Sequence, residues 1–238
     1  MSELLTVLYE DDSLFIVRKA PGLLSQRDAG GDPDLITLLK GRGRRGEVYP
    51  IHRLDRGVGG LVVAARTHGA AAALSADFAD HRRLTKEYLA VVHGTLDSEV
   101  GMLRHNLFHD ERKRRTFVLP EGDQRGKEAV LTYRVLLSVP RENGKMLSLL
   151  LIRLETGRTH QIRAQFSAIG HPLAGDGRYG AHDRYPSISL YSARLAFSHP
   201  TTGARLDFRS LPQGISAFSE FLITDSVFEA PSSSDAKE

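Results

Sequence analysis

The stretch RLETGRTHQIRAQFSAIGHPLAGDGRYG, residues 153–180, sets charged side chains and glycines between two expected elements. An apolar run leads into it and predicts a strand, which a glycine closes. A helix is then predicted to begin near Thr159 and to end at Gly170. On such a helix His160 and Arg163 share nearly one face, so Arg163 can point inward beside a buried carboxylate. An exposed, charged helix start is the competing interpretation.

Outward from this stretch, short apolar segments alternate with turn residues. Asp32 is predicted to cap a short helix that begins at Pro33. Because strands outnumber helices and often follow each other directly, we predict an α+β domain with a mixed, mostly antiparallel sheet flanked by helices and loops. The expected helices are 33–40, 67–83, 159–170 and 215–224, and the expected strands are two within 4–19, then 61–65, 85–94, 128–139, 146–155, 190–200 and 204–212.

Two further segments place polar groups beside buried strands. In HRLDRGVGG, residues 52–60, Asp55 lies in a glycine-rich turn before an apolar run, where a carboxylate can be held away from bulk water. A simple ion pair with a neighbouring arginine such as Arg53 is the alternative, and His52 is interpreted as a structural histidine. Tyr88 lies within a predicted strand, where a tyrosine lining the core is the ordinary explanation.

The composition limits the class of protein. A chain of 238 residues can bury one large core, and the absence of cysteine excludes disulfides, thiolate metal sites and cysteine nucleophiles. Of 32 basic residues only seven are lysine, a balance that favours nucleic acid as partner but that a GC-rich genome explains equally well. No signal peptide or membrane span is recognisable, which predicts a cytoplasmic protein. The polar tail 229–238 is expected to be disordered.

Taken in order, several segments resemble one known family. HRLD followed by LVVAART, then KEYLAVVHG, then the stretch 153–180 and ARLAFSHPTTG, is similar to the pseudouridine synthases of the RluA family. The resemblance covers nearly the whole chain and implies the pseudouridine synthase fold for residues 1–228. It implies isomerisation of a uridine within RNA: the C1′–N1 bond is broken, the uracil turns, and a C1′–C5 bond forms. No cofactor and no metal is expected.

The chain departs from the family pattern in two turns. Val58-Gly59-Gly60 stands where the family usually has Thr-Ser-Gly, which removes two hydroxyls close to Asp55. Lys19-Ala20-Pro21-Gly22 stands where Lys-Pro-Ala-Gly is usual. The glycines after Asp55 are expected to let the backbone approach RNA. Many relatives carry an N-terminal domain of the S4 type, and we expect this chain to lack one and to recognise RNA through its catalytic domain.

The resemblance assigns roles to named residues. Asp55 acts at the ribose, by attack on C1′ or by removal of the C2′ proton, and Arg163 is its basic partner. Tyr88 stacks on the flipped base with its hydroxyl near C5, and Arg53 fills the gap that the base leaves. Further basic residues are expected to contact the RNA backbone, namely Arg82, Arg83, Arg114 and Arg115. Arg158 and His160 are expected either to contact phosphate or to order the loop.

Two other functions compete with this interpretation. One is a non-catalytic RNA-binding or assembly protein on the same scaffold, which would have no use for Asp55, Tyr88 and Arg163 together. The other is a hydrolase built on His52 and Asp55, but the chain has neither a Gly-x-Ser-x-Gly elbow nor a His-Glu-x-x-His motif. The RNA partner is expected to be tRNA or rRNA, with the compact domain favouring tRNA, and the protein a monomer.

Overall fold

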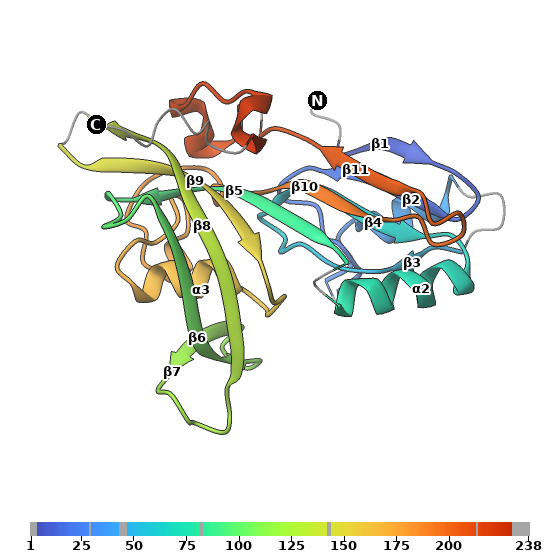
Figure 1. The fold of residues 1–238 in the computed structure, drawn as a ribbon, viewed down its shortest axis with the longest axis horizontal. Coiled ribbons are helices and arrows are strands. Elements are labelled where there is room, and N and C mark those ends of the chain that lie inside the picture. The colour runs from blue at the N-terminus through green and yellow to red at the C-terminus, as the bar shows by residue number, and fades with distance from the viewer. Residues whose placement is uncertain are drawn as a thin grey trace.

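One twisted sheet organises the computed structural model, which describes residues 4–28, 30–42, 47–80, 83–141, 144–212 and 214–229 (Figure 1). Its strands are β1 (Leu5–Glu10), β2 (Leu14–Lys19), β3 (Tyr49–Pro50), β4 (Gly59–Ala65), β5 (Thr85–His93), β6 (Val100–Asp110), β7 (Arg115–Leu119), β8 (Lys127–Pro140), β9 (Met146–Leu154), β10 (Leu190–Ser198) and β11 (Arg205–Arg209). The order is β1-β2-β4-β10-β5-β9-β8-β6-β7, with β3 paired to β4 and β11 to β10. Every named strand pair in the described chain is antiparallel except β4 with β10, so the prediction of a mixed, mostly antiparallel sheet is confirmed.

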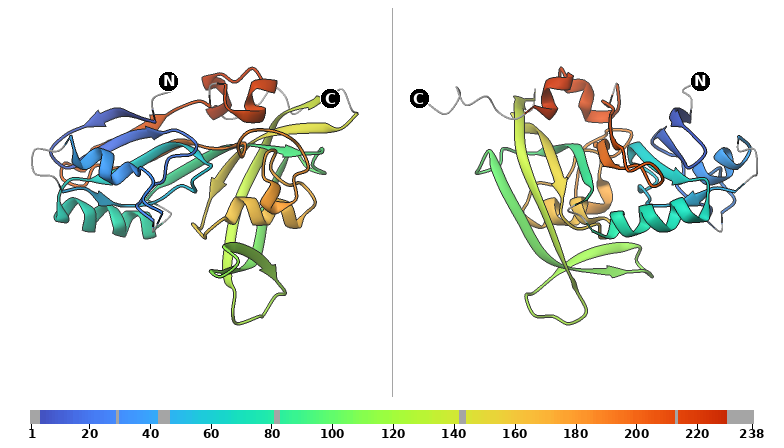
Figure 2. Two further views of the ribbon diagram at one scale, coloured as in Figure 1. Left: turned by 180° about the vertical axis from the view of Figure 1, so that it is seen from behind. Right: turned by 45° about the vertical axis from the view of Figure 1, so that its right-hand side comes forward.

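Short helices flank this sheet. They are α1 (Leu35–Lys40), α2 (His68–Ala79) and α3 (Gln161–Ala168), with 3-10 segments η1 (Gly177–Tyr179), η2 (Ser216–Glu220) and η3 (Asp225–Phe228). Figure 2 shows η2 and η3 on the opposite side of the molecule from α2 and α3. No helix among the described residues is both long and apolar enough to cross a membrane.

The expected cap of α1 was wrong. The carboxylate of Asp34, not of Asp32, accepts a hydrogen bond from the Thr37 amide at 3.0 Å, and the helix begins at Leu35. Asp32 instead pairs with Arg56 at 2.8 Å on the surface. Asp34 is the N-cap because its side chain, unlike that of Asp32, lies two to three residues before free helical amides.

The helix expected over 215–224 was also wrong, because η2 is a single 3-10 segment. Ser216 has a φ of 49°, which does not fit an α-helix. Phe218 and Phe221 lie three residues apart and both enter the apolar cluster beneath β5 and β9, a spacing that a 3-10 turn satisfies. Packing therefore decided this segment.

Strands β6 and β7 were not predicted. Most β6 side chains are exposed or half-buried, and His105, Asn106 and His109 interrupt its apolar alternation. Long-range pairing with β8 over Val100–Leu107 holds the strand in place.

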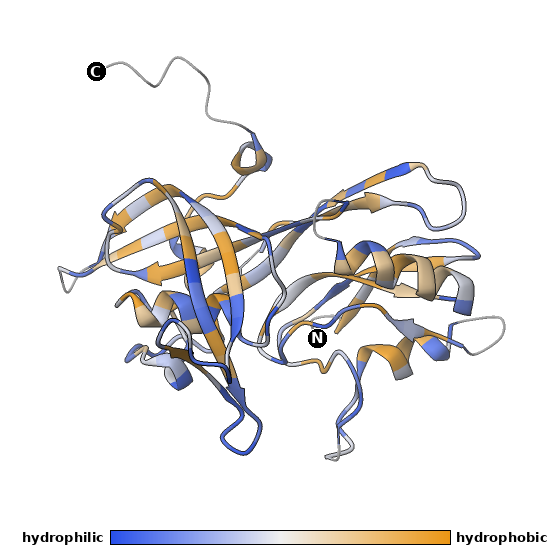
Figure 3. Cartoon of the chain, turned by 60° about the horizontal axis from the view of Figure 1, so that its bottom comes forward, coloured by the Kyte–Doolittle hydropathy of each residue, from blue (hydrophilic) through white to orange (hydrophobic). Residues whose placement is uncertain are grey.

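Figure 3 shows the apolar residues gathered along helices and central strands, with polar residues at the loop ends.

The centre of the sheet is where the two halves of the chain meet. Alternation along β5 is as predicted: Tyr88, Ala90 and Val92 face one apolar cluster, while Leu89 and Val91 face another. Beside β5, β10 runs parallel to β4, with Ser192 opposite Gly60. The turn before β4, the first residues of α3 and the face of Tyr88 therefore come together.

Glycines in this region serve the fold. Gly60 has a φ of 114°, and a side chain there would collide with the Ser192 carbonyl. A Cβ on Gly59 would lie 3.1 Å from Pro21 Cδ. The expectation that these glycines let the backbone approach RNA was wrong for this pair, because each faces protein. The two departures from the family pattern also meet here, since the displaced proline packs where the missing side chain of residue 59 would lie.

Candidate active site

The turn that carries Asp55 is fixed from behind by the turn at residues 20–25. The Ser25 hydroxyl donates to the Leu54 carbonyl at 2.8 Å and accepts from the Leu54 amide at 3.0 Å. Lys19, fully buried, donates its ammonium to the carbonyls of Leu23 at 2.8 Å and Arg56 at 3.3 Å. Burial lowers the pKa of Lys19 to about 8, although the charge of Asp55 opposes this shift. These contacts hold the backbone, while the Asp55 side chain stays 25% exposed and points into the cleft.

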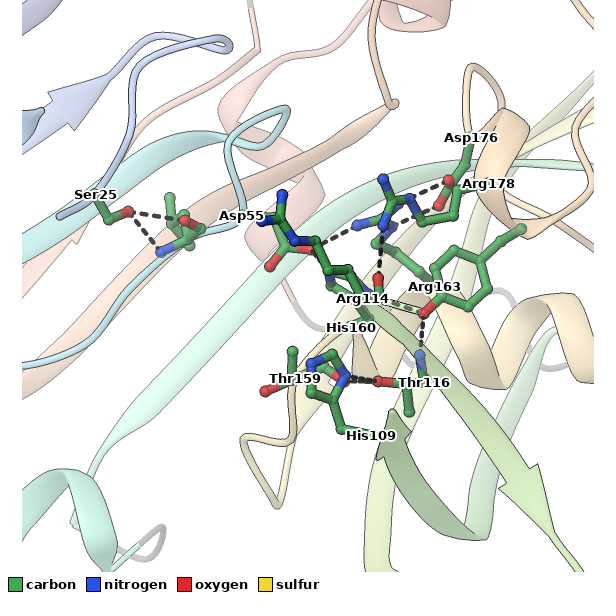
Figure 4. Close-up of polar contacts among 12 residues, drawn as sticks. Ser25, Asp55, His109, Arg114, Thr116, Thr159, His160, Arg163, Asp176 and Arg178 are labelled. Atoms are coloured by element: carbon green, nitrogen blue, oxygen red, sulfur yellow. Dashed lines mark hydrogen bonds and ion pairs between the residues drawn. The ribbon is translucent and has the colours of Figure 1, made fainter. Parts of the chain in front are cut away.

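Arg163 is clamped between two carboxylates (Figure 4). Its Nη1 donates to Asp55 Oδ2 at 2.9 Å, and its Nε and Nη2 donate to the two oxygens of Asp176 at 2.6 and 2.9 Å. The guanidinium also lies 4.8 Å above the centre of the Tyr179 ring. Burial alone would lower the pKa of Arg163, but hydrogen bonds to Asp176 and the charges of Asp176 and Asp55 outweigh it and raise the pKa. The side chain is thus a fixed positive charge beside Asp55.

His160 lies beside the same carboxylate. Its Nε2 is 3.5 Å from Asp55 Oδ2, and its Nδ1 is 2.9 Å from the Tyr179 hydroxyl. Burial lowers its pKa to about 4 against the effect of Asp55, and Arg163 adds to the lowering. The helix expected to begin near Thr159 is α3, which begins two residues later at Gln161, and His160 precedes it in a left-handed conformation with φ of 53°. This strained backbone turns the ring toward Asp55.

Tyr88 lines the cleft together with Asp55. A small cavity of about 80 Å³ is lined by Asp55, Val58, Tyr88 and Arg163, among others. Burial, followed by the charge of Asp55, raises the pKa of Tyr88, and the nearby Ser192 hydroxyl offsets only part of this. The phenol is therefore protonated at neutral pH. Val58 itself is 2% exposed and packs in the apolar cluster of Tyr88, so it adds no polar group to the site.

Three of the expected RNA-contacting arginines surround the opening of the cleft. Arg53 is exposed, lines the small cavity, and makes no hydrogen bond or ion pair within the part of the chain that the structure describes. Arg158 lines the same cavity and donates to the Glu128 carbonyl at 3.0 Å. Arg114 reaches an adjoining open cavity of about 600 Å³ from the β6–β7 turn. All three can meet a bound polyanion.

The other expected RNA contacts lie elsewhere. Arg83 is exposed but paired with Asp77 at 3.3 Å, and it does not line the described cavities around Asp55. Arg115 packs its guanidinium over the rings of Tyr179 and Phe117, at 5.1 and 5.5 Å, which gives it a structural role. Arg82 and residues 230–238 of the expected disordered tail lie outside the described residues.

Sequence reasoning missed the residues that support Arg163. Asp176 is 1% exposed, and the Tyr179 hydroxyl accepts from the Thr116 amide at 2.8 Å, which ties the β6–β7 hairpin to the site. Arg178 donates to the Arg114 carbonyl at 2.6 Å and lines the open cavity. The signal was present in GDGRYG, residues 175–180, where an acid and an aromatic residue sit among three glycines.

The structure removes the hydrolase alternative. His52 Nε2 accepts a hydrogen bond from the Val63 amide at 3.1 Å, and its ring stacks on Phe78 at 5.0 Å. Burial, with a smaller effect of Lys86, lowers the pKa of His52 to about 3. The imidazole is thus neutral, and its Nε2 lone pair already accepts the hydrogen bond from the Val63 amide, so it cannot act as a base with Asp55.

Comparisons with known proteins agree with this geometry. The family model described as RNA pseudouridylate synthase matches residues 13–168. The chain is 36% identical over 239 residues to "Ribosomal large subunit pseudouridine synthase D" of Zymomonas mobilis, covering 92% of this chain and 73% of that relative. It is 33% identical over 215 residues to "Dual-specificity RNA pseudouridine synthase RluA" of Haemophilus influenzae, covering 87% and 92%.

A solved structure also superposes on most of the chain. "Human RNA Pseudouridylate Synthase Domain Containing 1" aligns with a TM-score of 0.72 at 26% identity, covering 87% of this chain and 83% of the other. The matched segments include the turn with Asp55, the strand with Tyr88 and the helix with Arg163. The chain therefore belongs to the RluA family of RNA pseudouridine synthases, isomerases that convert uridine to pseudouridine within RNA.

Proposed function

We propose that this enzyme isomerises a specific uridine in a structured tRNA or rRNA, with Asp55 acting at the ribose. The main support for this proposal is that the two carboxylate oxygens of Asp55 have different surroundings. Oδ2 of Asp55 is held by Arg163 at 2.9 Å, whereas Oδ1 accepts no hydrogen bond from any residue that the structure describes. One oxygen fixes the orientation and the other is free to reach the sugar, by attack on C1′ or by taking the C2′ proton.

Tyr88 and Arg163 complete the proposed catalytic set. The ring of Tyr88 lines the small cavity beside Asp55 and can stack on a flipped uracil. Its raised pKa means that the hydroxyl is protonated when the base arrives, so it acts as a hydrogen-bond donor and can take the C5 proton only after losing its own. Arg163 keeps a positive charge beside the carboxylate throughout.

The exposed arginines are proposed to hold the RNA. Arg53, without a partner among the described residues and at the cavity edge, enters the space that the uridine leaves in its stack. Arg114, Arg158 and His160 face the same opening, and we assign to the two arginines contacts with phosphates. His160 is assigned instead to ordering Asp55, because its half-buried imidazole is neutral and lies beside that carboxylate.

The target RNA, the oligomeric state and the location are part of the proposal. One relative named above is called a synthase of the ribosomal large subunit, which supports rRNA as a substrate, and the other is called a dual-specificity RNA synthase, which is compatible with a second kind of RNA such as tRNA. Every catalytic group comes from one chain, which supports a monomer. We also propose that the enzyme is cytoplasmic, where both tRNA and rRNA are present.

The decisive experiment maps pseudouridines across cellular tRNA and rRNA. The strains compared carry wild type, a deletion, Asp55→Asn, or the matched surface variant Asp225→Asn on η3. We expect the same site or sites to vanish in the deletion and in Asp55→Asn, and to persist in Asp225→Asn. With purified enzyme, Asp55→Asn should reduce the rate by roughly 10²- to 10⁴-fold or more.

The possible outcomes separate the parts of the proposal. An unchanged map in the deletion would contradict modification of tRNA or rRNA and favour the non-catalytic assembly role. Sites that persist in Asp55→Asn but vanish in the deletion would keep the enzyme and remove Asp55 from the chemistry. Which RNA loses its pseudouridine decides between the two substrates.

A further inference from the structure

Lys86 is a buried charge without a counter-ion. It lies on β5 two residues before Tyr88 and is only 7% exposed. Its ammonium makes no hydrogen bond or ion pair with any residue in the described ranges. The Phe78 ring, 5.6 Å from Nζ, supplies only partial compensation. Proteins rarely bury a charge in this way unless it is paired or used.

The nearby acids are already engaged. These acids lie close in sequence to Lys86 itself, to Phe78 and to the loop at Gly157. Each acid has an arginine partner within 4 Å, so none is left to neutralise the ammonium: Glu87 with Arg194 at 3.3 Å, Asp77 with Arg83 at 3.3 Å, and Glu155 with Arg153 at 3.8 Å.

Two residues near the ammonium directly precede, in the sequence, residues that line the catalytic cleft. A Cβ built on Gly157 would be 3.6 Å from Nζ, and Gly157 directly precedes Arg158, which lines the cavity of Asp55. On the other side, His52 stacks on the same Phe78 ring and directly precedes Arg53. Two residues of strand separate Lys86 from Tyr88, roughly 7 Å. That span is comparable to the reach from a nucleobase to its own backbone.

We propose that Lys86 binds a phosphate of the RNA backbone adjacent to the target uridine, so that the substrate supplies the missing counter-ion. This inference rests on the proposed position of the uridine between Asp55 and Tyr88. Gly157 contributes by leaving the approach to Nζ open. Burial lowers the pKa of Lys86 to about 8, which leaves the ammonium mostly protonated at neutral pH and ready to pair.

The test is a double-mutant cycle between protein and RNA. The probe is a synthetic stem-loop containing the mapped uridine, made with ordinary phosphates or with one neutral methylphosphonate on the 5′ or the 3′ side of that uridine. The proteins are wild type, Lys86→Met, and Lys40→Met as a matched loss of charge at the exposed end of α1. Binding is measured over a series of salt concentrations, and thermal stability in parallel.

We expect Lys86→Met to weaken binding of the ordinary RNA roughly tenfold and to lower the salt slope by roughly one. One of the two methylphosphonates should weaken binding to wild type but not further weaken binding to Lys86→Met. The thermal midpoint should stay equal or rise, because an unpaired buried charge is removed. Lys40→Met should leave the sensitivity to both methylphosphonates unchanged.

Two results would overturn the inference. Additive losses at both linkages would show that Lys86 touches neither phosphate. A lower thermal midpoint with unchanged RNA affinity would give Lys86 a purely structural role. This cycle measures RNA binding, whereas the Asp55→Asn experiment measures the rate of modification. If Asp55→Asn kept its activity, the proposed role of Asp55 would be wrong, and the binding cycle would still test the contact between Lys86 and the phosphate.

Discussion

Arg163 and Arg53 line the same small cavity, yet their surroundings are opposite. Arg163 has a side chain 7% exposed and is fixed by two carboxylates and an aromatic face. Arg53 is exposed, with no ion pair among the described residues. A buried arginine held in this way cannot move with a substrate, but it can fix the geometry of Asp55. An exposed one is free to follow the RNA.

The largest effect is expected from the buried side, at Asp176. Asp176→Asn leaves Arg163 buried with only the partly exposed Asp55 as counter-ion, which should cost roughly 3 kcal/mol of unfolding free energy. Displacement of Asp55 should also slow single-turnover modification by roughly 10²-fold. Urea denaturation and rapid-mixing kinetics measure the two effects.

A surface pair provides the control for this prediction. Asp207→Asn disrupts the half-exposed pair with Arg194, where the loss should be no more than about 1 kcal/mol and the rate should not change. If Asp176→Asn changed the free energy of unfolding and the rate no more than Asp207→Asn, the buried contacts of Arg163 with Asp176 would not be important for stability or activity.

On the exposed side, Arg53→Ala should slow modification roughly tenfold or more while changing RNA affinity much less. The reason is that an unfilled gap in the stack raises the cost of flipping the base, a step worth a few kcal/mol. Rate and affinity are measured on the same RNA, with Arg18→Ala at the exposed position of β2 as control. An equal loss in rate and affinity would make Arg53 a binding residue only.

The response to pH tests the structural role of His52. Its pKa is lowered to about 3, so between pH 6.5 and pH 3 the unfolded chain binds a proton that the folded chain does not. Stability should therefore fall as pH decreases through this window, and Asp11, with a pKa lowered to about 2, adds a loss below pH 4.

Thermal midpoints at pH 7.5, 6 and 5 measure this loss. His52→Gln retains an acceptor for the Val63 amide but cannot titrate, so its midpoint should fall less on acidification, by a few °C. The exposed His68→Gln serves as control. An unchanged loss in His52→Gln would show that His52 is not the group responsible.

The smallest effect is expected between two neighbouring arginines. Arg114 faces the open cavity, so Arg114→Gln should lower the salt slope of RNA binding by roughly one and leave stability unchanged. Arg115 packs on two rings, so Arg115→Gln should lower stability and leave the salt slope unchanged. The reverse pattern would exchange their roles.

Most of the fold could be predicted from local pattern, and the errors have physical causes. The strand with Tyr88 and the alanine-rich helix that Thr67 caps were evident, because hydrophobic alternation and capping act within a few residues. Strand β6 was missed because its sequence lacks a clear apolar alternation, and backbone pairing with β8 holds it in the sheet instead. The helix expected near the C-terminus failed because Phe218 and Phe221 follow the core and not an α-helical period.

The chemical groups of the site can be read from the amino-acid sequence: a carboxylate at residue 55, a tyrosine at 88 and an arginine at 163, in an order that resembles a known family. Which arginine is buried and which is free depends on the three-dimensional fold, as does the support that Asp176 and Tyr179 give to the buried one. The fold also leaves Lys86 buried beside the cleft without a partner in the described chain. Burial and charge pairing depend on residues far apart in the chain, 108 positions in the case of Arg163 and Asp55, and no local pattern reports the dielectric around a side chain.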